Sequence, residues 1–492
     1  MAGGKRLSEL GLKARAGRDP VLSGLTADSR AVRPGFLFAA LAGSNRHGAD
    51  FVATALEAGA AAILTDAEGA AMAASALRAA PAALVVVDDP REALAYAAAL
   101  WFGAQPAVMA AVTGTNGKTS VATFTRQIWQ ALGHRAINIG TTGVEGDWTA
   151  PSPHTTPDPV TLQRMLAEAA AAGITHAAME ASSHGLDQRR LEGVRLAAAG
   201  FTNLTQDHLD YHGTMAAYFA AKAGLFTRLL PDEGTAVVNL DGAQAQEMAQ
   251  IALDRGLPVL STGTRRGTDL TIAAIRPDAT GQEVRFLWQA TPYQVRLNLI
   301  GAFQAENVAV AAGLAIACGA APAAVMARLP GLVGVRGRMQ LAATRRNGAA
   351  VFVDYAHTPD AIATALRALR PHVMGRLIIV FGAGGDRDRS KRPLMGAAAR
   401  EAADVLYVTD DNPRSENPAA IRAAILAACP EANEVGDRAE AILRAVDALL
   451  PGDALLIAGK GHETGQVIGA DIFPFDDVEQ ASIAVAALDG VI

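Results

Sequence analysis

Short apolar runs that end in glycine, aspartate or other polar residues alternate with helical patterns along this chain. Five such runs stand in the first half, at residues 61–65, 83–89, 107–114, 197–204 and 235–240, and four in the second, at 351–357, 377–385, 405–411 and 454–461. Apolar strands that alternate with helices are typical of largely parallel α/β sheets. Ligands of such folds bind beyond the carboxyl ends of the strands. The pattern therefore predicts α/β sheets and directs attention to the residues that end each run.

Length and composition limit what the chain can be. At 492 residues it is too long for one ordinary core, and Gly- and Pro-containing junctions near 101–106 and 329–338 predict three domains, 1–105, 106–333 and 334–492. A net charge of −6 argues against a nucleic-acid or membrane-surface binder. Cys318 and Cys429 lie in apolar, Ala-rich patterns and are expected to be buried free thiols. Without a signal-type segment or an apolar run long enough to span a membrane, we expect a cytoplasmic protein.

The stretch "AVTGTNGKTSVATF", residues 111–124, stands between an expected strand and an expected helix. Two glycines allow a tight turn whose N–H groups face a phosphate, and Lys118 and Thr119 suit phosphate oxygens and Mg²⁺. Only two residues separate Gly114 from Gly117, so the match to the usual phosphate-binding loop is a shortened one. The alternative is a glycine-containing turn with an incidental Lys-Thr pair. The stretch predicts nucleotide binding without establishing an enzyme.

Downstream residues add groups that ligate metals or move protons. Glu180, in "MEASSHGLDQRR", follows an apolar run, where a carboxylate at a strand end suits Mg²⁺ but also suits a helix cap. The segment "NLTQDHLDYHG" gathers Asp207, His208, Asp210 and His212. Lys222 lies in an otherwise apolar helical pattern, where taken alone it favours a surface lysine that extends its ammonium group into solvent.

These strings, "GTNGKTS", "TTPD", "MEASSHGLDQRR", "NLTQDHLDYHG" and "AAKAGLF", occur in the order and spacing of the Mur ligase family, which the chain resembles from residue 28 to residue 460. The resemblance implies three α/β domains: a UDP-substrate-binding domain, a central ATPase-like sheet that binds ATP and Mg²⁺, and a Rossmann-like C-terminal domain for the amino acid. It implies an ATP-dependent amide ligase of peptidoglycan assembly. Within the family the chain is similar to the member that adds the third amino acid.

The resemblance also implies roles for single residues. It makes Lys222 a lysine carbamylated by CO₂, and it implies Mg²⁺ ligation by Thr119, Glu180, His208 and carbamylated Lys222. The catalytic set would be Lys118, Lys222, His208 and Glu180. ATP would be held by Gly114, Thr115, Asn116, Gly117, Lys118, Thr119, Ser120, Asn307 and Arg338. The UDP-muramoyl dipeptide would be held by Ser29, Ser44, Asn45, Arg46, Thr155, Thr156, Ser182, Gln188 and Arg190.

Such a set fits acyl activation. A carboxylate becomes a good acyl donor when the γ-phosphoryl of ATP is transferred to it, because phosphate then leaves in place of oxide. An amine attacks the acyl phosphate, and we expect the domains to close so that water is excluded. Two positions depart from the family pattern. His154 and Gln304 both stand where asparagine is more usual.

The C-terminal strings indicate which amine is added. A distal amino-acid head, which meso-diaminopimelate has and lysine lacks, calls for a guanidinium beside carboxylate and amide groups. By the resemblance, "DNPR" marks diaminopimelate addition. The predicted ligands are Arg387, Asp411, Asn412, Pro413, Arg414, Gly459 and Glu463. The alternative for the string "DNPR" is a polar surface turn that begins at Asn-Pro and has no role in binding. Asp354 and His357, at another strand end, could contribute to the site or merely cap a helix.

The sequence thus predicts a monomeric ligase that adds meso-diaminopimelate to UDP-MurNAc-L-Ala-D-Glu with ATP and Mg²⁺. A lysine-adding sister enzyme would lack the arginine of "DNPR", and a folylpolyglutamate synthetase-like ligase would lack the N-terminal "TADSR" segment. A motor or switch that hydrolyses ATP would need neither Lys222 nor two further substrate domains.

Overall fold

The computed structural model describes residues 4–43, 46–79, 81–152 and 154–491. The chain forms two compact units, one made of residues up to Thr262 together with Val310–Ala321, the other of Gly263–Ala309 together with Pro322 onward. The domain boundaries expected at 105 and 333 stay predictions. Within the described residues, no helix is both long and apolar enough to cross a membrane.

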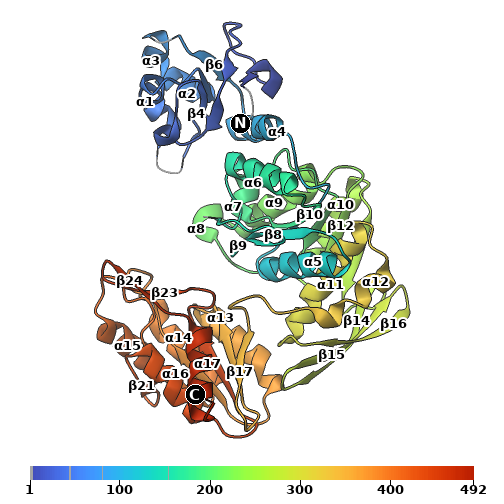
Figure 1. Cartoon of the computed structure of the whole chain (residues 1–492), viewed down its shortest axis with the longest axis vertical. Coiled ribbons are helices and arrows are strands. Elements are labelled where there is room, and N and C mark those ends of the chain that lie inside the picture. Colours follow the sequence, from blue (N-terminus) through green and yellow to red (C-terminus); the bar gives the residue numbers. More distant parts are fainter. Residues whose placement is uncertain (1–3, 44–45, 80, 153, 492) are drawn as a thin grey trace. The chain divides into compact units, whose positions relative to one another are not determined.

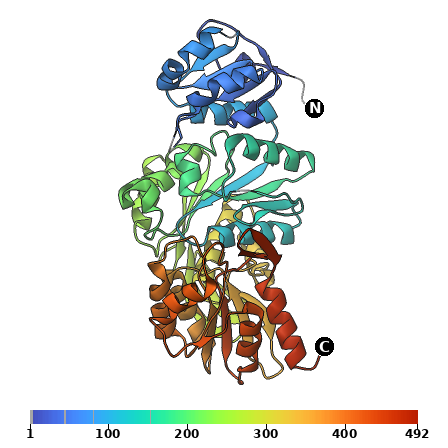
Figure 2. The same ribbon diagram turned by 90° about the vertical axis from the view of Figure 1, so that its left-hand side faces the viewer.

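The first unit begins with a parallel four-stranded sheet, β3-β4-β5-β6. Alternate residues of β4, such as Leu37 and Phe38, enter different apolar clusters. Both faces of the sheet are therefore covered, as a parallel sheet requires (Figure 2). The elements are β3 (Gly24–Thr26), β4 (Phe36–Ala39), β5 (Ala62–Thr65), β6 (Ala83–Val86), α1 (Val52–Glu57), α2 (Ala67–Met72), α3 (Ala74–Ala79) and α4 (Pro90–Phe102), preceded by the hairpin β1 (Lys5–Arg6) and β2 (Val21–Leu22).

The same unit carries a sheet of order β13-β12-β11-β7-β10-β8-β9, parallel except for β9 (Figure 1). Strand β7 pairs with β10 on one side and β11 on the other, so its carboxyl end is a topological switch point, where such sheets bind ligands. The strands are β7 (Val108–Thr113), β8 (Ala136–Gly140), β9 (Gly143–Gly146), β10 (His176–Glu180), β11 (Ala198–Phe201), β12 (Thr235–Asn239) and β13 (Val259–Gly263).

Helices connect these strands, and three of them, α6, α7 and α9, begin at a residue whose side chain caps the helix. Ser182 caps α7 and Thr214 caps α9, each through a side-chain oxygen that accepts a backbone N–H. The helices are α5 (Lys118–Ala131), α6 (Pro159–Ala171), α7 (Ser183–Asp187), α8 (Leu209–His212), α9 (Met215–Gly224) and α10 (Ala245–Asp254).

The second unit contains an antiparallel set, β14 (Leu270–Asp278), β15 (Gly281–Trp288) and β16 (Thr291–Leu297), that the apolar runs of the sequence did not predict. Its larger sheet has the order β17-β18-β22-β19-β20-β21 and is parallel except for β17. These strands are β17 (Gln340–Thr344), β18 (Ala350–Asp354), β19 (Leu377–Phe381), β20 (Val405–Val408), β21 (Asn433–Glu434) and β22 (Ala454–Ala458).

Helices cover both faces of this sheet. Phe352 and Leu456 pack with residues of α13–α15, whereas Val351 and Leu455 pack with α16 and α17. The helices are α12 (Pro322–Met326), α13 (Pro359–Leu369), α14 (Lys391–Ala402), α15 (Pro418–Leu426), α16 (Arg438–Asp447) and α17 (Asp477–Leu488), and a hairpin of β23 (Gly465–Ile468) and β24 (Asp471–Pro474) precedes the last of them. Helix α11 (Ala302–Ala317) contributes residues to both units. All nine strands predicted from apolar runs are present.

Both cysteines have free thiols, as predicted. Cys429 is buried and Cys318 is partly exposed.

Candidate active site

The glycine-rich loop lies at the switch point of the first unit, between the end of β7 and the start of α5 at Lys118. Gly114 has φ +147° and Gly117 has φ +87°, values that side chains rarely allow. A Cβ atom on Gly114 would stand 1.9 Å from the Thr202 hydroxyl, so glycine is required there. A helix N-terminus behind a tight glycine turn is the arrangement that anions prefer.

The segment that follows β11 holds the glycine-rich loop in place through hydrogen bonds. The Thr115 N–H donates to the Asn203 carbonyl at 2.9 Å, and the Asn116 N–H donates to Asn203 Oδ1 at 3.0 Å. The Thr202 hydroxyl donates to the Asn116 carbonyl at 2.6 Å. The loop is therefore held in shape by two strands, β7 and β11, rather than by its own residues alone.

Lys222 points from α9 to the same loop and is 1% exposed. Its Nζ donates to the Gly114 carbonyl at 2.7 Å, and Lys118 Nζ donates to that carbonyl at 3.0 Å. Burial, assisted by the charge of Lys118, lowers the pKa of Lys222 from 10.5 to about 6. The interpretation as a surface lysine is therefore wrong, and the side chain is a neutral amine at neutral pH.

Tyr218 connects Lys222 with the His208 segment. Its hydroxyl lies 3.2 Å from Thr115 Oγ1, and its ring centroid is 4.5 Å from Lys222 Nζ. The His208 ring lies 6.2 Å from the Tyr218 ring, with Nε2 3.5 Å from the carboxylate of Asp207. Burial raises the pKa of Tyr218 to about 12, so its hydroxyl stays protonated and can donate.

Glu180 ends β10, the strand beside β7, and is 2% exposed. Its Oε1 accepts the Thr141 N–H at 2.8 Å, and a Cβ atom on Gly140 would meet Oε1 at 2.0 Å. Ser182, not Glu180, caps the following helix, so the capping alternative for Glu180 is wrong. A buried carboxylate one strand from the phosphate loop fits a Mg²⁺ ligand.

The residues predicted to hold the muramoyl dipeptide gather around Thr156. Its hydroxyl donates to the Glu180 carbonyl at 2.9 Å and accepts the Ser182 N–H at 3.0 Å. Arg190 donates to the Thr156 carbonyl at 2.6 Å and to Gln188 Oε1 at 2.7 Å. Thr155 Oγ1 lies 3.0 Å from the hydroxyl of Thr141, which also contacts Glu180. Hydrogen bonds thus connect these five residues with Glu180, through its main-chain carbonyl and through Thr141 at its carboxylate. His154 is exposed.

Two of the predicted UDP contacts, Ser29 and Arg46, lie in the described part of the N-terminal domain. Ser29 begins a short 3₁₀ helix, Ser29–Ala31, that is capped by Asp28, and Arg46 is exposed in the segment after β4. Ser44 and Asn45 lie outside the described residues. A hollow of about 570 Å³ in the same sheet region is lined by alanines and by Arg15, Arg18 and Arg78, and it includes none of these predicted contacts.

The C-terminal candidates meet at the carboxyl ends of β20 and β22. Asn412 Nδ2 donates to Glu463 Oε2 at 2.9 Å, and a Cβ atom on Gly459 would lie 2.4 Å from Asp411 Oδ2. Asp411 is 7% exposed and Asn412 is 5% exposed, so this string is not a solvated turn. Carboxylate and amide groups therefore stand together as predicted.

Arg414 follows in the same loop with φ +50°. Its main chain pairs with the β23–β24 hairpin, through its N–H to the Val467 carbonyl at 3.1 Å and the Gly469 N–H to its carbonyl at 2.8 Å. Its guanidinium donates to the Gly385 carbonyl at 2.7 Å. Pro413 is buried, and a Cβ atom on Gly385 would meet the Pro413 carbonyl at 1.9 Å. Arg387 is exposed on the neighbouring loop after β19.

Asp354 ends β18 and accepts the N–H groups of Met339 at 2.6 Å and Ala356 at 2.9 Å. Thr358 caps the following helix, so the capping alternative for Asp354 is wrong. Burial raises the pKa of Asp354. Arg338 lies over the Tyr355 ring at 5.1 Å.

On α11, Gln304 Oε1 accepts Asn307 Nδ2 at 3.2 Å, so this departure from the family pattern orients the predicted adenosine ligand.

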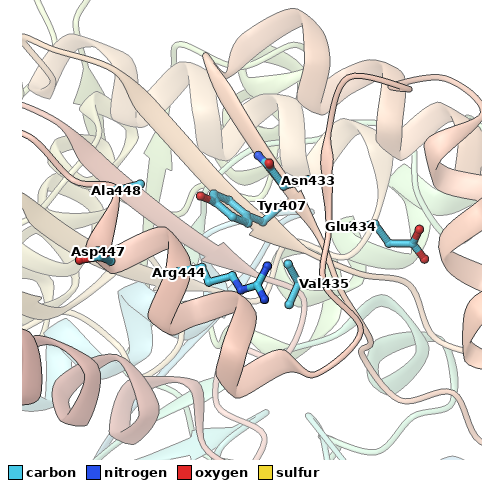
Figure 3. A pocket seen from close by; sticks show the side chains of 7 residues that line it. All are labelled: Tyr407, Asn433, Glu434, Val435, Arg444, Asp447 and Ala448. Atoms are coloured by element: carbon cyan, nitrogen blue, oxygen red, sulfur yellow. The ribbon is translucent and has the colours of Figure 1, made fainter.

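A hollow of about 380 Å³ lies away from these strand ends, between β20, β21 and α16 (Figure 3). Tyr407, Glu434 and Arg444 line it, and Arg444 is paired with Glu440. It contains none of the predicted site residues.

Three family models match the chain: a Mur ligase family catalytic domain at 21–101, a Mur ligase middle domain at 112–315 and a Mur ligase glutamate ligase domain at 337–461. This chain belongs to the Mur ligase family. Among curated relatives, a UDP-N-acetylmuramoyl-L-alanyl-D-glutamate–2,6-diaminopimelate ligase of Bradyrhizobium diazoefficiens is 52% identical, with 95% of each chain covered. One of the same name from Caulobacter vibrioides is 50% identical, with 99% of each covered. A solved structure of that name is 35% identical, has a TM-score of 0.75 and covers 98% of this chain and 99% of its own.

The comparisons confirm the predicted three-domain α/β fold class of this Mur ligase. Within the described residues, no three His, Cys, Asp or Glu side chains are grouped to hold a metal ion. Only Glu180 and His208 of the predicted Mg²⁺ ligands belong to these types, so the predicted set also needs Thr119 and a modified Lys222. The Glu180 carboxylate and the Thr119 hydroxyl offer the oxygen atoms that Mg²⁺ prefers, whereas the imidazole of His208 is a nitrogen donor.

Sequence reasoning missed several residues of this Mur ligase site. Tyr218 lies in the same "YFAAKAGLF" string as Lys222, and Thr202 and Asn203 stand at the end of a predicted strand, so position alone could have indicated them. Lys460 stands inside the string "AGKGHE" but was passed over for its neighbours. The fully buried pair of Arg438 and Asp477 had no local signal, because its two residues are distant in sequence.

Proposed function

We propose that this Mur ligase adds meso-2,6-diaminopimelate to UDP-MurNAc-L-Ala-D-Glu, with ATP cleaved to ADP and phosphate. The relatives that share about half of its residues over nearly its whole length carry this activity in their names. The observation that carries the choice of amine is the cluster of Asp411, Asn412 and Glu463 beside Arg414. It offers a guanidinium for a carboxylate and carboxylates for an ammonium.

Activation of the substrate carboxylate comes first. Mur ligases use ATP with Mg²⁺. Mg²⁺ supplies charge neutralisation between ATP and the carboxylate. Lys118 adds a positive charge at the loop, and we propose that Arg190 and Thr156, which share a hydrogen bond, hold the dipeptide end. We infer that ATP is bound by Gly114, Thr115, Asn116, Gly117, Lys118, Thr119, Ser120, Asn307 and Arg338, and the UDP substrate by Ser29, Ser44, Asn45, Arg46, Thr155, Thr156, Ser182, Gln188 and Arg190.

Amide formation follows. Transfer of the γ-phosphoryl group leaves ADP and a carboxylic–phosphoric anhydride on the dipeptide, and the diaminopimelate amine attacks its carbonyl carbon. The C–N bond forms, the C–O bond to phosphate breaks, and the amine gives up a proton. The amino acid would be held by Arg387, Asp411, Asn412, Pro413, Arg414, Gly459 and Glu463.

We also propose that Lys222 carries a carbamate. A neutral amine is the form that attacks CO₂, and burial next to Lys118 makes the amine neutral. The nitrogen forms a bond to the carbon of CO₂ and loses one proton, which converts a neutral amine into an anion. That anion would lie close to the positive charge of Lys118, because both lysines contact the Gly114 carbonyl. Together with Thr119, Glu180 and His208 it would complete the Mg²⁺ ligand set.

The test measures phosphate release from ATP in the presence of UDP-MurNAc-L-Ala-D-Glu, with either meso-diaminopimelate or L-lysine. Release only with diaminopimelate supports the proposal, and release with lysine would keep the ligase and reject the choice of amine. Phosphate release that does not depend on either amine would indicate an ATPase that forms no amide bond. Because its substrates are ATP and a UDP-linked precursor, we propose a cytoplasmic enzyme, and the monomeric state stays a prediction.

A further inference from the structure

Lys460 is a fully buried cation in the C-terminal cluster that the proposed ligands do not include. It follows β22, and its side chain is 0% exposed. Its Nζ donates to Asn412 Oδ1 at 3.2 Å, to Glu463 Oε2 at 3.4 Å and to the Gly465 carbonyl at 2.5 Å. An ammonium group has three donors, so all of them are used. Such a charge is costly to bury, and here it lies in contact with two of the proposed ligands, Asn412 and Glu463.

The contacts of Lys460 determine how Asn412 presents its amide. Asn412 Oδ1 accepts both Lys460 Nζ and the Val467 N–H at 2.9 Å, while Nδ2 donates to Glu463 Oε2. A flipped amide would place NH₂ against two other donors, so the network allows one orientation.

The same contacts orient Glu463. Its Oε2 receives hydrogen bonds from Lys460 and Asn412, while within the described residues Oε1 has no hydrogen-bond partner. The side chain is 34% exposed, so Oε1 is accessible to a ligand. One carboxylate oxygen is thus tied to the protein and the other is left to accept a donor.

We propose that Lys460 is the positioning residue of the amino-acid pocket: it fixes Asn412 and turns Glu463 Oε1 toward the ammonium of the distal amino-acid head. The proposal rests on the proposed function, because that head is present only in a substrate such as diaminopimelate.

The test compares Lys460→Met with the full-length enzyme under steady-state conditions, with each substrate varied in turn. Loss of the charged donor should raise KM for diaminopimelate by roughly tenfold to a hundredfold. KM for ATP and for the UDP substrate should stay within about twofold. Lys460→Gln is one atom shorter and uncharged but keeps an N–H donor group, so it should show a smaller rise, and it replaces the methionine variant if that protein does not fold.

Arg345→Met is the matched control. Arg345 forms an ion pair with Asp489 near the start of β18, whereas the C-terminal cluster lies at the carboxyl ends of the strands. Its loss should therefore lower the melting temperature and leave KM for diaminopimelate unchanged. Because Lys460 acts partly through Glu463 and partly through Asn412, the double variant Lys460→Met/Glu463→Gln should have a KM below that expected from the sum of the two single effects.

An unchanged KM for diaminopimelate in both Lys460 variants, an equal rise for all three substrates, or additive effects in the double variant would overturn the proposal. Failure of the proposed function would look different, because the wild-type enzyme would then show no diaminopimelate-dependent turnover.

Discussion

Replacement of Lys222 by methionine should stabilise the protein while it removes the ligase activity. The folded chain holds this amine with a pKa of about 6, against 10.5 for an exposed lysine. Keeping the amine neutral at pH 7, which lies about 3.5 pH units below the unfolded value, costs about 5 kcal/mol at roughly 1.36 kcal/mol per unit. The variant also loses the hydrogen bond to the Gly114 carbonyl, worth about 1 kcal/mol. The expected net gain is therefore about 4 kcal/mol.

The sign of the pH dependence follows from the direction of the shift. Between about pH 6 and 10.5 the unfolded chain binds the lysine proton and the folded chain does not, so wild-type stability rises with pH. From about pH 7 to pH 9 this group alone raises the free energy of unfolding of wild type by about 3 kcal/mol. The methionine variant lacks this contribution. The difference in free energy of unfolding between the two proteins should therefore become smaller by the same amount as the pH rises from about 7 to about 9.

Guanidinium chloride unfolding, followed by circular dichroism at several pH values in CO₂-free buffer, measures this difference. Lys13→Met changes an exposed lysine and should give a curve parallel to wild type. Bicarbonate should raise the stability of wild type only, because the variant lacks the buried amine on which we propose that a carbamate forms. Parallel pH curves for wild type and Lys222→Met would refute the reasoning, since the lysine would then be charged in the folded state.

Three further substitutions test other parts of the site. Arg414→Leu should lower kcat/KM for diaminopimelate about a hundredfold, because it removes a charge-assisted pair. The kcat/KM for L-lysine should change little. An equal loss for both amines would contradict a role of Arg414 in selecting the head group. Arg190→Met should raise KM for the UDP substrate at least about tenfold in steady-state assays and leave KM for ATP unchanged; a change confined to ATP would place it elsewhere. Gly114→Ala should abolish ATP binding in calorimetry, because its Cβ would meet the Thr202 hydroxyl at 1.9 Å; normal binding would mean that the loop can rearrange.

The strands were predictable because each is an apolar run buried on both faces, and such runs leave a continuous signal in the sequence. The antiparallel strands β14–β16 were missed although Gly281–Trp288 alternates between buried and exposed residues. An alternating strand does not present the continuous apolar run by which the other strands are visible. The hairpin of β23 and β24 was missed for another reason. Gln466 to Phe473 are largely exposed, and main-chain contacts with Arg414 place the hairpin.

The candidate site was predictable where its residues are contiguous in the sequence. Gly114 to Thr119 and Asp411 to Arg414 are contiguous, and their residue types suggest their chemistry. Lys222 shows the limit, since an isolated lysine in an apolar helix is usually at the surface. Only the fold shows it 2.7 Å from the Gly114 carbonyl, 108 residues away in sequence. Long-range contacts of this kind have no local pattern from which they could be predicted.

The loop that carries Arg414 is shaped by main-chain atoms. Its backbone pairs with Val467 and Gly469, and the Gly385 N–H donates to the Asn412 carbonyl at 2.9 Å. These main-chain contacts do not depend on which side chains the loop carries, although the side chains of Asn412 and Arg414 add hydrogen bonds to Val467 and Gly385. Amino-acid preference in such a pocket can therefore change by substitution at a few positions while the scaffold stays the same. A library restricted to Asn412, Arg414, Lys460 and Glu463 would search for enzymes that attach other amino acids.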